Sequence, residues 1–152
     1  MNNKIFERQT LINRPLKEVF EFFSNAENLN ILTPVNLSFK ILTSLPIQMH
    51  KGVQINYQLK FKGIPFKWKT LIVDWEPPFK FVDEQINGPF AKWEHIHLFE
   101  ARDGKTLMTD KLIYRSKGGF LANVIHFLFV DKDVKQIFEY RKMRLNELFP
   151  DT

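Results

Sequence analysis

Apolar and polar residues alternate along several segments of the chain, which is typical of strands with one buried and one exposed face. The clearest segment has polar residues between Ile55, Tyr57, Leu59 and Phe61, and the alternation resumes over 66–69 after Gly63-Ile64-Pro65, which we interpret as a turn. Further strands are predicted over 4–12, 79–86, 91–101 and 106–115. Asn87-Gly88-Pro89 and Asp103-Gly104 supply turns between the later strands.

Other segments are instead predicted to be helical. The first is Pro15–Ser24, with a proline suited to a first helical turn, and a second short helix is expected to end near Thr33-Pro34. After Gly118-Gly119 come two apolar stripes, with Asp131 between them as a candidate helix cap. The stripes are Leu121, Val124, Ile125 and Leu128, then Val134, Ile137, Phe138, Arg141, Leu145 and Leu148.

This order of elements predicts an α+β fold: one strand, two short helices, about six successive antiparallel strands and a long C-terminal helix. A curved sheet must cover its apolar face, and the last helix is the element large enough to do so. We expect one domain over residues 1–152, with a ligand cavity between the sheet and that helix.

The segment 93–99 contains the polar residues that are candidates for ligand binding or catalysis. Its alternation places Trp93, His95, His97 and Phe99 on the inner face. If Asp103-Gly104 is a two-residue hairpin turn, the register pairs these positions with the next strand. The predicted pairs are Trp93 with Tyr114, His95 with Leu112, His97 with Asp110 and Phe99 with Met108.

A carboxylate among aromatic side chains needs a hydrogen-bond donor, so we predict a His97–Asp110 pair. This pair could simply fix the sheet register, or it could present a ring nitrogen to a ligand. A metal shared by His95 and His97 is less favoured, because no third ligand beyond Asp110 is evident. General-base catalysis has Tyr114 as a candidate acid but no nucleophile. We therefore predict no metal, no cofactor and no catalytic residue.

The composition limits the possible classes of protein and of functional site. Hydrophobic residues make up 44% and charged residues 26% of the chain, which is ordinary for a globular protein. Sixteen Phe suit strands and the walls of apolar cavities. The absence of cysteine excludes disulfides, zinc–thiolate sites and thiol nucleophiles. No apolar signal segment follows Met1, so we expect a cytoplasmic protein.

The formal net charge is +5, and residues 28–73 hold six lysines and no acidic residue. Four of them form an outward lysine patch, Lys60, Lys62, Lys67 and Lys69. Such a face is usually just solvated, although it could meet anionic lipid as a peripheral membrane contact. Nucleic acid binding is not favoured, because no aromatic residues lie between these lysines on the outer face.

Four stretches resemble the START-like, Bet v 1-like helix-grip (SRPBCC) superfamily, and within it a bacterial branch of cyclase/dehydrase-like ligand-binding proteins. They are Gly63-Ile64-Pro65 with Trp68, Phe81-Val82-Asp83-Glu84-Gln85 with Gly88-Pro89-Phe90, Trp93-x-His95-x-His97-x-Phe99, and Phe138-Glu139-Tyr140-Arg141. Asp110 and Tyr114 also match this branch. The resemblance implies a seven-stranded antiparallel sheet and a cavity under the last helix. Lys117 stands where the branch often has proline, so we expect a looser entry to the last helix at the mouth of the cavity.

The leading hypothesis is binding of a small hydrophobic or amphipathic ligand, with transport or sensing as its purpose. The alternatives are a polyketide cyclase- or aromatase-like enzyme and a membrane- or RNA-associating protein. Arg141 could meet Asp110 or an acidic ligand group. The facing of Asp83 and Gln85 stays open, because the length of the Asn87-Gly88-Pro89 loop is not fixed. The predicted ligand-binding residues are Trp93, His95, His97, Phe99, Asp110, Leu112, Tyr114, Phe138 and Arg141.

Overall fold

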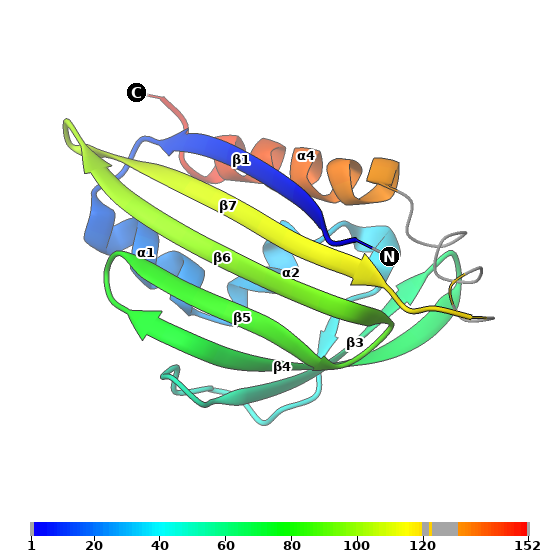
Figure 1. Ribbon diagram of the computed structural model, residues 1–152. Helices are drawn as coiled ribbons and strands as arrows, with labels where there is room; N and C mark the ends of the chain where they lie inside the picture. The colour runs from blue at the N-terminus through cyan, green and yellow to red at the C-terminus, as the bar shows by residue number, and fades with distance from the viewer. Residues whose placement is uncertain (1, 120–121, 123–130, 152) are drawn as a thin grey trace.

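The architecture is a seven-stranded antiparallel sheet with helices against one face, seen in a computed structural model that describes residues 2–119, 122 and 131–151 (Figure 1). The sheet order is β1-β7-β6-β5-β4-β3-β2. Each strand from β2 to β7 thus lies beside the next strand in the sequence, and β1 pairs with β7 at the opposite edge from β2. The strands are β1 (Lys4–Ile12), β2 (Lys40–Ile41), β3 (Gln54–Phe61), β4 (Ile64–Glu76), β5 (Lys80–Asn87), β6 (Phe90–Arg102) and β7 (Lys105–Ser116).

The helices lie on one side of the curved sheet (Figure 1). They are α1 (Leu16–Ser24), α2 (Asn28–Leu32), the 3₁₀ turn η1 (Val35–Leu37) and α4 (Asp131–Leu148). The expected α+β helix-grip architecture is confirmed, with its two short helices after β1 and its C-terminal helix. The predicted stripe from Leu121 to Leu128 and the capping role of Asp131 lie outside the residues and side chains described. In the described part of the chain, none of the helices has the length and apolarity needed to span a membrane.

Two hairpin turns fix the register of the sheet. Asp103 and Gly104 have positive φ values of 50° and 77°, and Arg102 pairs with Lys105, as a two-residue turn requires. The earlier turn differs from the prediction. It consists of Lys62 and Gly63, with φ of 47° and 82°, while Ile64 and Pro65 already belong to β4. Lysine is uncommon at a left-handed position, so the sequence pattern did not indicate Lys62 as a turn residue. The predicted turn therefore began at Gly63, one residue too late.

The apolar side chains form two clusters under the helices. The first joins strands β3, β4, β6 and β7 to α4, with Trp68, Phe90, Leu112 and Phe138 among its members. The second joins α1 to strands β5, β6 and β7, and Phe20 lies at its centre. Between these clusters the buried face of the sheet becomes polar, at His95, His97 and Asp110.

Candidate functional site

The strand pair β6–β7 positions both histidines. Every predicted pair of the register is present: Trp93 with Tyr114, His95 with Leu112, His97 with Asp110 and Phe99 with Met108. His95 and His97 are 6% and 5% exposed, so both point into the protein. Their rings lie side by side with centroids 3.8 Å apart and a tilt of 30°, which is the consequence of two neighbouring positions on one face of a strand.

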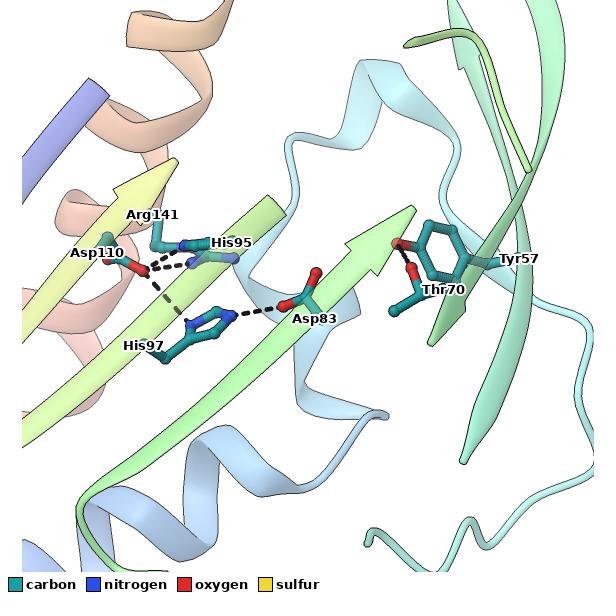
Figure 2. A network of polar contacts seen from close by, with 7 residues as sticks. All are labelled: Tyr57, Thr70, Asp83, His95, His97, Asp110 and Arg141. Carbon is teal, nitrogen blue, oxygen red and sulfur yellow. Dashed lines mark hydrogen bonds and ion pairs between the residues drawn. The ribbon is translucent and has the colours of Figure 1, made fainter. Parts of the chain in front are cut away.

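Asp110 is the centre of the polar network, but its partner differs from the prediction (Figure 2). His95 Nε2 lies 2.8 Å from Asp110 Oδ1, whereas His97 Nδ1 lies 3.6 Å from the same oxygen and makes no hydrogen bond there. Arg141 donates from Nη1 to Asp110 Oδ1 at 3.3 Å. The predicted Arg141–Asp110 contact is therefore confirmed. The predicted His97–Asp110 pair is present in the register and as this 3.6 Å contact. The hydrogen bond expected for it is absent, because the diagonal neighbour His95 reaches the carboxylate better than the residue directly opposite.

His97 instead turns toward β5. Its Nε2 lies 2.6 Å from Asp83 Oδ2, and its ring stacks on Phe81 with centroids 4.1 Å apart. Asp83 pairs with His95 in the register and faces inward, which settles the facing that the loop length left open. Gln85 is no part of this network. Its side chain closes the β5–β6 turn through hydrogen bonds with the backbone N–H and C=O of Phe90.

Burial and hydrogen bonding oppose each other in this network. Burial raises the pKa of Asp110, but the hydrogen bond from His95 and the charge of Arg141 outweigh it, so the pKa lies well below its ordinary value. Burial also raises the pKa of Asp83, but the hydrogen bond from His97 and the neighbouring positive charge, including that of Arg141, together outweigh it and lower this pKa. Burial, aided by His95, lowers the pKa of His97 to about 4. At neutral pH two carboxylates are therefore ionised beside a neutral His97, which donates its Nε2–H to Asp83.

A cavity of about 170 Å³ opens beside this network. Trp93, His95, His97 and Arg141 line it, as does Asp83. Other predicted ligand-binding residues, Leu112, Tyr114 and Phe138, pack in the first core cluster behind the wall, and Phe99 packs in the second. Asp110 stands behind His95 and is 2% exposed. A direct ligand contact by these five residues stays a prediction.

The cavity also extends toward β3 and β4, beyond the predicted ligand-binding residues, which lie on β6, β7 and α4. Its remaining wall is largely aromatic and aliphatic, and it includes Tyr57, Leu59, Phe61, Trp68, Ile55, Leu32, Leu37, Phe39 and Met49. The alternation in β3 and β4 already marked several of these as inward. The alternation does not indicate which inward residues border the cavity and which pack against one another.

Tyr57 adds a second polar spot on the far side of Asp83 (Figure 2). Its hydroxyl lies 2.8 Å from Thr70 Oγ1, and burial, followed by the charge of Asp83, raises the pKa of Tyr57 far above its ordinary value. We therefore expect Tyr57 to resist ionisation in an ultraviolet titration until alkali unfolds the chain. Tyr57→Phe should remove that late step, and an unchanged titration curve would contradict the assignment.

The lysine patch faces away from the cavity. Lys60 and Lys67 are exposed and Lys69 is half-buried, which agrees with the predicted outward side of the β3–β4 hairpin. Contact of this patch with anionic lipid stays a prediction.

Comparison with known protein families identifies the family of this chain. The profile of the family described as polyketide cyclase/dehydrase and lipid transport matches residues 12–142. The chain belongs to this family. A search of curated protein sequences finds no match.

Solved structures similar to this family member share its fold at low sequence identity. A protein from Chromobacterium violaceum superposes with a TM-score of 0.75 at 9% identity, covering 97% of this chain and 98% of the other. The Zhui aromatase/cyclase from a Streptomyces species gives 0.73 at 10% identity, with 97% and 93% covered. Ginseng major latex-like protein 151 from Panax ginseng gives 0.70 at 11% identity, with 99% and 100% covered. These likenesses show the same helix-grip fold, and the predicted superfamily is supported by the family match.

Proposed function

We propose that this family member binds a small, mostly apolar ligand in the cavity beside His95 and His97, for transport or sensing. The observation that carries the proposal is the cavity itself, an apolar space bordered by a few convergent polar groups. A solid core would have filled this space with side chains, since protein interiors are packed at crystal-like density.

The size of the cavity limits the ligand. A dry cavity of roughly 150 Å³ holds benzene, so a space of about 170 Å³ suits a compound of about one ring. The aromatic wall favours a flat ligand, because Tyr57 and Trp68 stack on each other and Trp93 meets Trp68 edge-on. A small aromatic compound with one polar substituent fits these walls better than a sterol or a long acyl chain.

A cyclase-like enzyme is the second candidate. It is favoured by the two ionised carboxylates and two imidazoles at one end of the cavity, which are groups able to move protons. The family description and the aromatase/cyclase neighbour support it by analogy only. Turnover of a small polyketide-like compound, abolished by His97→Gln, would favour this candidate over simple binding.

Native mass spectrometry of the purified protein tests the binding proposal directly. We expect a co-purified or added small aromatic compound to remain bound at one per chain. Protein that carries no ligand and takes up none from a panel of one-ring and two-ring aromatic compounds would overturn the proposal.

Filling the cavity gives a matched mutational test. Leu59 is 8% exposed and lines the cavity, so Leu59→Trp should occupy the space and abolish binding of the aromatic ligand. Leu98 is 39% exposed on β6, and Leu98→Trp serves as the control. Fluorescence titration of both variants should show loss of binding in the first alone. Equal affinity in the two variants would place the ligand elsewhere.

A further inference from the structure

We propose that Asp83, His95 and His97 bind one divalent transition-metal ion, such as Zn²⁺, at the wall of the cavity. Asp110 would lie behind this site and orient both imidazoles. The inference is independent of the ligand proposal, since it rests on the polar network and not on the apolar walls.

The three side chains converge from two paired strands. His95 and His97 occupy neighbouring inward positions of β6, and Asp83 stands opposite His95 on β5. Each offers one ligand atom, and these atoms all lie within 4.8 Å of one another. Two ligands of a tetrahedral ion with bonds of about 2.1 Å lie about 3.4 Å apart. His97 Nε2 and Asp83 Oδ2, now at 2.6 Å, would need to separate by less than about 1 Å.

His95 is already held as a metal ligand would be. Its Nε2 lies 2.8 Å from Asp110 Oδ1, which leaves Nδ1 for a metal, and no hydrogen bond to Nδ1 is found among the described residues. A carboxylate behind a ligating imidazole fixes the tautomer and raises the basicity of the ring. Arg141 completes this outer layer by donating to the same carboxylate.

His97 supplies the observation that a simple hydrogen-bond network leaves unexplained. Its Nδ1 is buried, lies 3.6 Å from Asp110 Oδ1 and has no hydrogen-bond partner within the described part of the chain. A metal on Nε2 would displace the hydrogen there, and the ring would then carry its hydrogen on Nδ1, where Asp110 can accept it. The metal-bound state thereby gives the orphaned nitrogen a partner, and Asp110 then supports both histidines.

The local charge also favours a cation. The network holds two acidic side chains, Asp83 and Asp110, against the single guanidinium of Arg141, which is an excess of one acidic group within a mostly apolar wall. A divalent ion would offset it. Two imidazoles and a carboxylate are a donor set for Zn²⁺, Co²⁺ or Fe²⁺, and they leave coordination positions open to a ligand in the cavity.

Titration calorimetry with Zn²⁺ on tag-free, chelator-treated protein tests the site. We expect one Zn²⁺ per chain, and Co²⁺ should give visible absorption bands of a nitrogen and oxygen environment. His95→Gln should abolish this binding, and Asp110→Asn should weaken it roughly 10–100-fold through the outer shell. His50→Gln is the control, because His50 is exposed and, among the described residues, its ring hydrogen-bonds only the backbone C=O of Lys51.

The circular dichroism spectrum of each metal-free variant should match that of the wild type, so that loss of binding is not loss of fold. The proposal is overturned if wild-type protein shows no saturable 1:1 binding of Zn²⁺ or Co²⁺, or if His50→Gln weakens binding as much as His95→Gln. The same metal-free protein, given aromatic compounds in native mass spectrometry, tests the ligand proposal separately.

Discussion

Arg141→Met should lower the free energy of unfolding by about 3–5 kcal/mol, because it leaves a buried carboxylate without its cation. Asp110 is 2% exposed and Arg141 is 8% exposed, so water cannot replace the lost guanidinium. The hydrogen bond from His95 would remain, but the nearest compensating charge would be gone. Methionine keeps most of the side-chain volume, so the effect reports charge more than a cavity. Urea denaturation measures it.

Two further variants separate this cause from a general effect of removing arginine. Arg102 is exposed and contacts Glu100 at 3.4 Å, so Arg102→Met should change stability by no more than about 0.5 kcal/mol. Adding Asp110→Asn to Arg141→Met should restore much of the loss, because the remaining side chain still accepts from His95 and carries no charge. Equal losses in the two arginine variants, or no recovery in the double variant, would show that the ion pair is not responsible.

The sequence predicted the backbone of the site well, because strand geometry depends on local rules. Asp103-Gly104 has the composition of a two-residue turn, and such a turn determines the pairs of β6 and β7 from Arg102–Lys105 as far as Lys92–Arg115. Period-two alternation then gave the inward face of His95 and His97. These features require knowledge only of neighbouring residues, and the structure confirms them.

The hydrogen-bond partners could not be predicted in the same way. Backbone register places His97 opposite Asp110, yet side-chain torsions carry His97 toward Asp83 and leave Asp110 to His95. The facing of Asp83 depended on a loop whose length the sequence did not fix. The position of the cavity also depends on how α1, α2 and η1 cover the sheet, which is a matter of tertiary packing and not of periodicity.

Phe20→Ala should cost about 3–5 kcal/mol of stability, because it opens a cavity where α1 meets the sheet. Phe20 is 4% exposed, and its ring contacts Trp75, Phe81 and Phe99 at centroid distances of 5.3, 6.0 and 5.3 Å. Edge-to-face contacts of this kind add to the burial of the ring itself. Thermal and urea unfolding of the variant measure the loss.

The matched control is Phe79→Ala, because Phe79 is 59% exposed at the turn between β4 and β5. This variant should lose no more than about 1 kcal/mol, since most of its ring already contacts water. Phe81 connects the second cluster to the cavity wall, because its ring meets Phe20 edge-to-face and stacks on the ring of His97. Loss of Phe20 should therefore weaken ligand binding as well as stability. If Phe20→Ala is no worse than Phe79→Ala, the second cluster does not anchor α1 over the cavity.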